Sequence, residues 1–150
     1  PERSGGLPCF QLAEMATQDG VTFPEMMRRM QRKGGLMDWF GTSDAREIER
    51  RIHEGDGKAA LVYEAMAHNL AKNIGKLAVV TRGRLDAILL TGGVARSRML
   101  TDWVAERVSF LAPVHVLPGE NEMESLALGV LRVLRGEEEA HTFAERTEAS

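Results

Sequence analysis

The chain has 150 residues, of which 43% are hydrophobic and 27% charged, and its formal net charge is −3 at pH 7. This length and composition fit one globular domain with its own core and exclude a disordered or fibrous chain. The slight acidic excess, without a basic stripe, argues against a protein that binds nucleic acid or a membrane surface. The longest apolar runs, 77–80 and 87–90, are too short to span a bilayer, and no signal-peptide pattern opens the chain. A cytoplasmic setting is the simplest expectation.

The first part of the chain predicts two short helices. It opens with Pro-Glu-Arg-Ser-Gly-Gly-Leu-Pro and no initiator methionine, which indicates a fragment of a longer protein. Pro8 suits the first turn of one helix, and Cys9, which has no disulfide or metal partner, is expected to be a small buried residue. Thr22 and Glu25 have the spacing of a capping box and predict a second helix that stops at 33–35.

The middle of the chain predicts two more helices. After a short apolar turn at 36–40, residues 41–44 offer several caps for a helix that continues through Ile52. The spacing of apolar residues over 58–80 then predicts a long amphipathic helix. Its apolar stripe comprises Val62, Met66, Leu70, Ile74 and Leu77, widened by Tyr63, Ala67 and Ala71. This width predicts packing against more than one neighbour.

Two strands follow. Residues 86–99 are typical of a buried strand, a tight turn at Gly92 and Gly93, and the start of a helix that Ser97 caps. A second strand is predicted at 112–117. The strand–helix–strand order implies parallel strands joined by a right-handed crossover. Two parallel strands leave edges and a sheet face uncovered, so most of the sheet is expected in a segment upstream of this chain.

The end of the chain predicts one more helix and a tail. Asn121 and Glu124 have capping-box spacing, and the apolar pattern that follows stops at Gly136. Residues 137–150 are polar and are expected to be frayed. The predicted organisation is therefore a helix-rich α/β segment over 1–136, followed by this tail.

Gly92 and Gly93 are the first candidates for a ligand site. Glycine can adopt positive φ and bring bare backbone close to a ligand, and a helix start offers unpaired N–H groups with a partial positive charge. The same arrangement also occurs in α/β proteins that bind nothing there. Residues 55–58, Gly-Asp-Gly-Lys, lack phosphate-loop spacing, and the sequence has no G-x-G-x-x-G, zinc motif or nucleophilic triad.

Four stretches of the sequence are informative together: residues 2–8, 34–36 with 41–49, 91–95 and 118–127. Together they resemble the acetokinase family, which belongs to the superfamily of acetate kinase, sugar kinases, Hsp70 and actin. Residues 2–8, Glu-Arg-Ser-Gly-Gly-Leu-Pro, resemble its arginine-containing loop. Residues 34–36 followed by 41–49 resemble its nucleotide-side loop and helix, and 91–95, Thr-Gly-Gly-Val-Ala, resemble its adenosine-binding motif. Residues 118–127, Pro-Gly-Glu-Asn-Glu-Met-Glu-Ser-Leu-Ala, resemble its C-terminal acidic motif in the form associated with butyrate kinases. All four occur in the family's order and spacing.

The resemblance implies roles for residues of the first two stretches. Arg3 corresponds to the arginine that contacts the phosphoryl group in transfer, a task that suits a planar guanidinium; a surface arginine is the alternative. Asp44, Ala45 and Arg46 fall where the family places residues around the ribose and adenine. Acetate kinases have an aromatic residue at the position of Ala45. Asp44 and Glu47 also have capping-box spacing, and both roles are compatible.

The other two stretches imply the rest of the nucleotide site. The resemblance implies that Gly92, Gly93 and Val94 form the surface beneath the adenosine, called the adenosine floor below. Glu122 aligns with the acidic residue near Mg²⁺, where hard oxygen ligands suit a metal that bridges ATP phosphates; Glu120 and Glu124 are the alternatives. Residues 95–97, Ala-Arg-Ser, replace the Gly-Glu-Asn usual in acetate kinases, which argues against acetate as the substrate.

The fold that the resemblance implies is part of a ribonuclease H-like domain of the actin and Hsp70 ATPase type, helix-rich with parallel strands. The implied reaction is reversible: butanoate and ATP give butanoyl phosphate and ADP, with Mg²⁺. An acetate or propionate kinase and a non-catalytic nucleotide-binding module are the alternatives. The implied partners are the short-chain carboxylate or acyl phosphate, a missing N-terminal portion of the same protein, and further copies in a homo-oligomer. The chain alone is expected to lack kinase activity.

Overall fold

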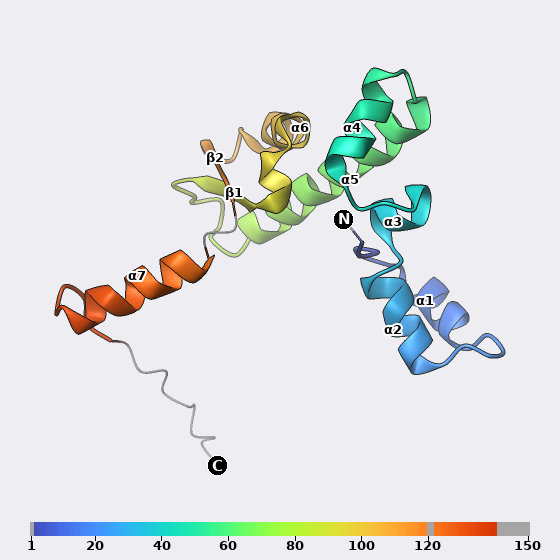
Figure 1. The fold of residues 1–150 in the computed structure, drawn as a ribbon, viewed down its shortest axis with the longest axis horizontal. Coiled ribbons are helices and arrows are strands. Elements are labelled where there is room, and N and C mark those ends of the chain that lie inside the picture. The colour runs from blue at the N-terminus through green and yellow to red at the C-terminus, as the bar shows by residue number, and fades with distance from the viewer. Residues whose placement is uncertain (1, 120–121, 141–150) are drawn as a thin grey trace, which may run out of the picture. The chain divides into compact units, whose positions relative to one another are not determined.

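The structure, a computed structural model, describes residues 2–119 and 122–140 (Figure 1). Residues up to Pro118 form one compact unit, and those from Gly119 onward form a second. In chain order the elements are α1 (Cys9–Ala16), α2 (Phe23–Gln31), α3 (Gly35–Phe40), α4 (Ala45–His53), α5 (Gly57–Ala78), β1 (Ile88–Gly92), the 3-10 turn η1 (Gly93–Arg96), α6 (Arg98–Val108), β2 (Val114–Pro118) and α7 (Glu122–Leu134). Among the described residues no helix is long and apolar enough to cross a membrane.

The opening helix α1 differs from the prediction in what it buries. None of its residues is buried, and both Phe10 and Cys9 are exposed. The expectation that Cys9 is buried is therefore wrong. Burial requires a neighbour that covers the side chain, and within residues 2–119 no element packs extensively against α1.

Local capping signals begin the next helices where the sequence predicts them. The Thr22 side chain accepts a hydrogen bond from the backbone N–H of Glu25, and α2 starts at Phe23, directly after Thr22. The apolar turn expected at 36–40 is a short helix, α3, which ends at Gly41 with φ of 69°. At the start of α5, Asp56 accepts from the backbone N–H of Ala59 at 3.0 Å. This aspartate lies in the turn between α4 and α5.

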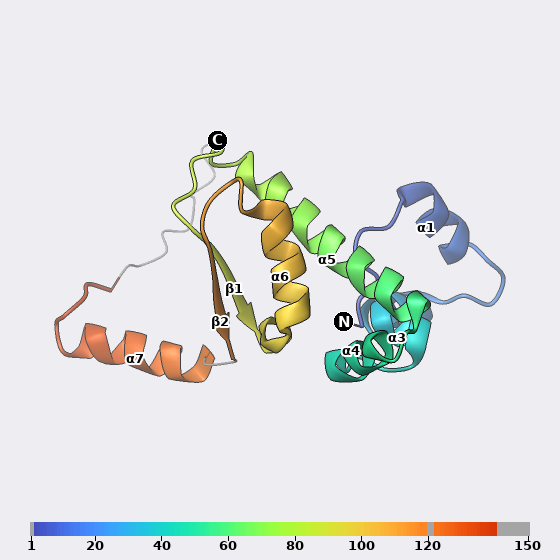
Figure 2. The same cartoon turned by 90° about the horizontal axis from the view of Figure 1, so that it is seen from above.

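The long helix α5 buries part of the face that the sequence predicts. Its buried residues are Ala59, Tyr63, Ala67, Ala71 and Ala78. Tyr63, Ala67 and Ala71 are therefore buried as predicted, whereas Leu70 and Leu77 are exposed and the prediction is wrong for these two. The small alanines let α4 pack on the first part of α5 and α6 on the second (Figures 1 and 2). Burial thus follows the surfaces that neighbouring helices can approach.

The two strands pair in parallel, as predicted. The register joins Ile88 to Val114 and Gly92 to Pro118, with α6 in the crossover between the strands (Figure 2). Ile88 is buried in the core with α5 and α6, whereas Leu89 and Leu117 on the opposite sheet face are exposed. One face of the sheet therefore carries large apolar side chains that nothing in residues 2–119 covers.

The second unit contains α7. Its exposed large apolar side chains are Met123, Leu126, Leu128, Val130, Leu131 and Leu134. Gly136, with φ of 72°, follows the helix, and Arg132 Nε lies 2.9 Å from Glu138 Oε2. The predicted cap Asn121 and the tail residues 141–150 lie outside the described residues. The division into a segment over 1–136 and a tail stays a prediction.

Candidate functional site

Arg3 lies on a segment that is tied to the loop between α2 and α3. The N–H of Ser4 donates to the carbonyl of Met30 at 2.9 Å, and the N–H of Gly34 donates to the carbonyl of Glu2 at 2.9 Å. Gly34 is buried at this crossing. The residues on both sides of Arg3 are therefore fixed by backbone hydrogen bonds, while Arg3 itself is exposed and accessible to a ligand.

Asp44 and Arg46 form a two-pronged ion pair at the start of α4. Asp44 Oδ1 accepts from Arg46 Nε at 3.0 Å, and Oδ2 accepts from Nη2 at 2.7 Å. Asp44 Oδ1 also accepts from the backbone N–H of Arg46 at 3.0 Å, which caps the helix. These hydrogen bonds from Arg46, side chain first and backbone second, lower the pKa of Asp44. The Arg46 side chain is 90% exposed, so its Nη1 remains accessible to a ligand.

The capping box expected between Asp44 and Glu47 is not formed. Asp44 caps through the N–H of Arg46, and the Glu47 carboxylate pairs with Arg51 at 2.7 Å along the same helix. The carboxylate of Asp44 thus serves two functions at once: it begins α4 and it orients the guanidinium of Arg46. Ala45, the first residue of α4, is partly buried against the core.

The glycine turn ends β1 and leads into η1. Gly92 has φ of 85°, and a Cβ placed on it would meet no atom within 4 Å. Bare backbone with open space above it fits the close approach of a nucleoside. Gly93 is exposed, and Val94 packs partly against the core.

The helix after this turn starts directly after Ser97, as the sequence predicts. The 3-10 turn η1 separates Gly93 from α6, whose first residue is Arg98. Ser97 caps α6, as expected, because its Oγ accepts from the N–H of Leu100 at 3.0 Å. The N–H groups at the start of α6 therefore do not lie at the glycine pair. Recognition at this turn would depend on the backbone of the turn itself.

A buried polar cluster connects α4, which carries the ion pair of Asp44 and Arg46, to the segment that follows the glycine turn. Glu49 of α4, Tyr63 of α5 and Ser97 at the start of α6 are hydrogen-bonded to one another. Sequence reasoning missed Glu49 and Tyr63 because they are distant in the chain from the glycine turn. The one available signal was a tyrosine among small residues on the buried side of α5, since a buried phenol needs a partner.

An apolar cavity of about 430 Å³ lies beside the glycine turn, between α5, β1, η1 and α6. Its lining residues are Met66, Leu70, Ile74, Leu89, Leu90, Thr91, Val94, Ala95, Leu100, Thr101 and Val104. The polar side chains among them are two threonines, so the cavity suits apolar groups better than phosphates. Val94 is shared between this cavity and the predicted adenosine floor.

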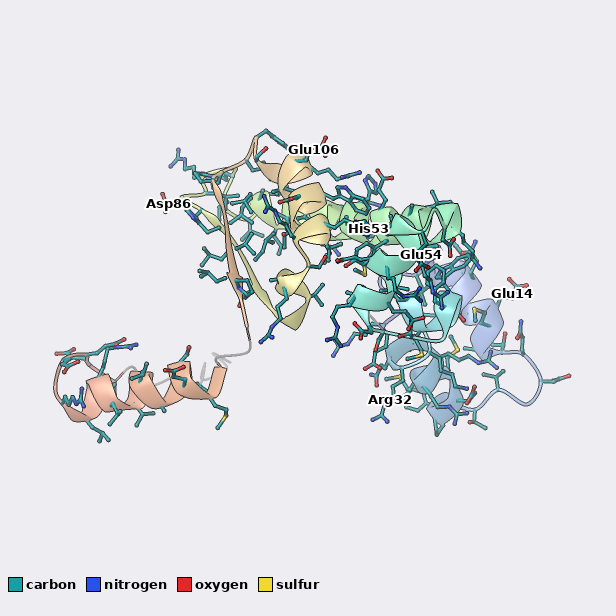
Figure 3. The ribbon with its side chains drawn as sticks, turned by 45° about the horizontal axis from the view of Figure 1, so that its top comes forward. Glu14, Arg32, His53, Glu54, Asp86 and Glu106 are labelled. Carbon is teal, nitrogen blue, oxygen red and sulfur yellow. The ribbon has the colours of Figure 1, made fainter. Side chains whose placement is uncertain are left out.

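The metal prediction falls outside what the structure describes. Glu122 is the first residue of α7, but its side chain lies outside the described part, as does Glu120. Across residues 2–119 and 122–140, no three His, Cys, Asp or Glu side chains are grouped to hold a metal. Figure 3 shows the labelled Glu54, Asp86 and Glu106 at separate places, after α4, before β1 and in α6. The role of Glu122 stays a prediction.

The sequence pattern described as the acetokinase family matches residues 2–123, which is most of the chain. The chain belongs to the acetokinase family. It is 47% identical over 138 residues to probable butyrate kinase 2 of Caldanaerobacter subterraneus subsp. tengcongensis, covering 92% of this chain and 39% of that protein. It is 43% identical over 143 residues to butyrate kinase 2 of Clostridium acetobutylicum, covering 95% of this chain and 40% of that protein. The chain thus spans about two fifths of the length of these curated relatives.

Solved structures confirm the predicted fold class. Acetate kinase of Porphyromonas gingivalis matches with a TM-score of 0.72 and 22% identity, covering 87% of this chain and 40% of that one. Acetate kinase of Entamoeba histolytica matches with a TM-score of 0.70 and 21% identity, covering 85% and 41%. A propionate kinase of Francisella tularensis matches with a TM-score of 0.64 and 24% identity, covering 73% and 29%. The helix-rich α/β fold with parallel strands is therefore shared with these kinases.

Proposed function

We propose that this chain supplies the adenosine site and the transition-state arginine of a kinase that phosphorylates butanoate. The reaction transfers the γ-phosphoryl group of ATP reversibly to the carboxylate and gives butanoyl phosphate and ADP. Relatives named butyrate kinase are 43–47% identical to the chain, whereas the acetate and propionate kinases above are 21–24% identical. This difference supports butanoate over acetate or propionate.

The observation that carries the proposal is the anchoring of Arg3. Backbone hydrogen bonds fix the residues on either side of it, and its side chain is exposed. A guanidinium held in this way can meet the equatorial oxygens of a transferring phosphoryl group and offset the charge that spreads over them. No covalent nucleophile from this chain is needed, because positioning and charge compensation suffice for phosphoryl transfer.

The nucleotide is proposed to bind between two stretches of backbone. Gly92 and Gly93 offer bare backbone to the adenosine, with Val94 completing the floor, and the accessible end of Arg46 faces a ligand at the start of α4. Asp44 holds that guanidinium in its ion pair. Mg²⁺, bound with the ATP phosphates, would add charge neutralisation there, and Glu122 is the residue proposed to lie near it.

A further segment is proposed to complete the site. The exposed Leu89 and Leu117 indicate that more structure covers the open sheet face, and the relatives are longer than this chain. The phosphate-holding loops and the carboxylate pocket are assigned to that segment, which would precede this chain. A cytoplasmic location and a homo-oligomer stay predictions from the sequence.

The test uses the full-length protein that contains this chain. Acyl phosphate is trapped with hydroxylamine, and initial rates are compared for acetate, propionate and butanoate with ATP. We expect the highest kcat/KM for butanoate. We expect Arg3→Ala to lower kcat by about 1,000-fold or more, with Arg3→Lys recovering only part, while the KM for ATP changes little. Full activity of Arg3→Ala, or of residues 1–150 alone, would contradict the proposal.

A further inference from the structure

Glu49, Tyr63 and Ser97 form a buried hydrogen-bonded cluster at the junction of three helices. The Tyr63 hydroxyl lies 2.9 Å from Ser97 Oγ and 3.2 Å from Glu49 Oε1, and the Ser97 hydroxyl donates to the same Glu49 oxygen. Ser97 Oγ also accepts from the N–H of Leu100. Each hydroxyl proton has an acceptor, and Tyr63 and Ser97 are 0% and 8% exposed. The cluster is therefore fully connected, with both hydroxyls shielded from water and Glu49 partly buried.

The position of each member in the chain gives the cluster its importance. Glu49 lies three residues after Arg46 on α4, and so about one helical turn from the ion pair of Asp44 and Arg46. Ser97 directly follows η1, and its N–H donates to the carbonyl of Val94 at 3.1 Å. The cluster thus joins α4, which begins at residues 44–46, to the turn at 92–94. These two stretches are the predicted halves of the nucleotide site.

Tyr63 provides the rigid support for this connection. Its ring is buried on α5 and packs edge to face against Trp103 of α6, with centroids 5.9 Å apart. Tyr63 belongs to the same hydrophobic core as Ile48 and Leu100. Apolar contacts alone tolerate sliding between helices, whereas a chain of directional hydrogen bonds from Tyr63 through Ser97 to one carboxylate oxygen of Glu49 defines a single relative placement.

The chemistry of the cluster argues against a direct role in the reaction. Burial raises the pKa of Tyr63 to about 12, so the phenol stays protonated at working pH and acts as a donor. The Ser97 oxygen is buried and already accepts two hydrogen bonds, which leaves no open approach for a substrate. Neither group is therefore placed as an acid, a base or a nucleophile.

We propose that Glu49, Tyr63 and Ser97 are positioning residues that hold residues 44–46 and the turn at 92–94 at the separation that one adenosine requires. This inference rests on the proposed function, because it assumes that both stretches bind one nucleotide. Removing one member leaves a buried polar group without its partner and lets α4 shift relative to α6. ATP affinity should fall, whereas the affinity for the carboxylate should not.

The experiment compares Tyr63→Phe, Ser97→Ala, Glu49→Gln and Glu49→Ala in the full-length protein. Calorimetry gives the Kd for ATP, kinetics give separate KM values for ATP and butanoate, and thermal melts show whether each variant folds. We expect Kd and KM for ATP to rise by about tenfold for Glu49→Ala and by less for Glu49→Gln, which keeps one acceptor oxygen. The KM for butanoate should stay unchanged. Effects of Tyr63→Phe and Ser97→Ala should be less than additive in the double variant.

Arg50→Gln is the matched control, because Arg50 pairs with Glu54 on the exposed side of the same helix. It should leave both KM values unchanged. The inference is overturned if Tyr63→Phe, which removes a single oxygen atom, folds and binds ATP as the wild type does. A parallel rise in both KM values would also overturn it. An ATP-binding wild type that does not phosphorylate butanoate would contradict the proposed function, while the Kd comparison would still decide this inference.

Discussion

Gly34 lies directly against the backbone of Ser4. A Cβ placed on Gly34 would be 2.4 Å from Ser4 N and 2.7 Å from Ser4 Cα, closer than real Cβ contacts allow. The neighbouring atoms belong to the backbone, so no flexible side chain can move aside. Glycine is therefore required here for close approach, and this approach fixes the backbone beside Arg3.

The first prediction follows from that contact. Gly34→Ala should push residues 2–4 away from the loop between α2 and α3 and misplace Arg3. We expect kcat of the full-length protein to fall at least tenfold, because a displacement of about 1 Å at a catalytic group has large kinetic effects. Gly57→Ala is the matched control, since a Cβ there meets nothing within 4 Å. Equal kcat values for the two variants would refute the positioning role of Gly34.

The second prediction concerns the turn at Gly92. Its φ of 85° lies in a region that side-chain-bearing residues avoid, although the space around it is open. Gly92→Ala should therefore act through backbone strain and destabilise the fold by about 1–3 kcal/mol. The predicted adenosine floor should be distorted as well, so the KM for ATP should rise. Chemical denaturation and ATP titration measure the two effects, and an unchanged midpoint would contradict the strain argument.

The third prediction uses the pair of Asp44 and Arg46. Asp44→Asn removes the charge that orients the guanidinium, so we expect a rise in the KM for ATP of a few fold and a small decrease in Tm. Asp102→Asn is the control, because Asp102 forms an exposed pair with Arg98 on α6. A variant of Asp44 with the KM of the wild type would contradict an active role for this pair.

The same pair gives a pH dependence with a defined sign. The pKa of Asp44 is lower in the folded state than in the unfolded chain, where it is about 3.9. The pair therefore stabilises the fold above about pH 4, and this contribution is lost as pH falls through the folded pKa. The Tm difference between wild type and Asp44→Asn should be constant from pH 5 to 8 and should shrink in more acidic buffer.

The fourth prediction tests the environment of Tyr63, the single tyrosine of this chain. The difference in phenolate absorbance between wild type and Tyr63→Phe should show ionisation near pH 12 instead of about 10. Because the folded pKa is raised, the contribution to stability is complete below about pH 10 and is lost as pH rises towards 12. Ionisation at pH 10 in the folded protein would show that the phenol is not buried.

Features that depend on nearby residues could be predicted from the sequence. Thr22, Asp44 and Ser97 cap helices where their local spacing indicates, because a cap requires only the next few backbone N–H groups. The parallel pairing of β1 and β2 follows from their order around a helix. The family motifs are likewise contiguous, so the sequence alone led to the acetokinase family.

Other features were decided only by tertiary structure. Which residues of the predicted α5 face are buried depends on the helices that approach it: Tyr63 and Ala67 are covered, whereas Leu77 is exposed. Gly34 and Ser4 meet across the chain, and Ser97 lies 48 residues from Glu49 and 34 from Tyr63. No spacing rule relates residues so far apart. The sequence determined local turns, caps and motifs, whereas packing decided which of them meet, because burial and hydrogen bonding act between surfaces that only the fold brings together.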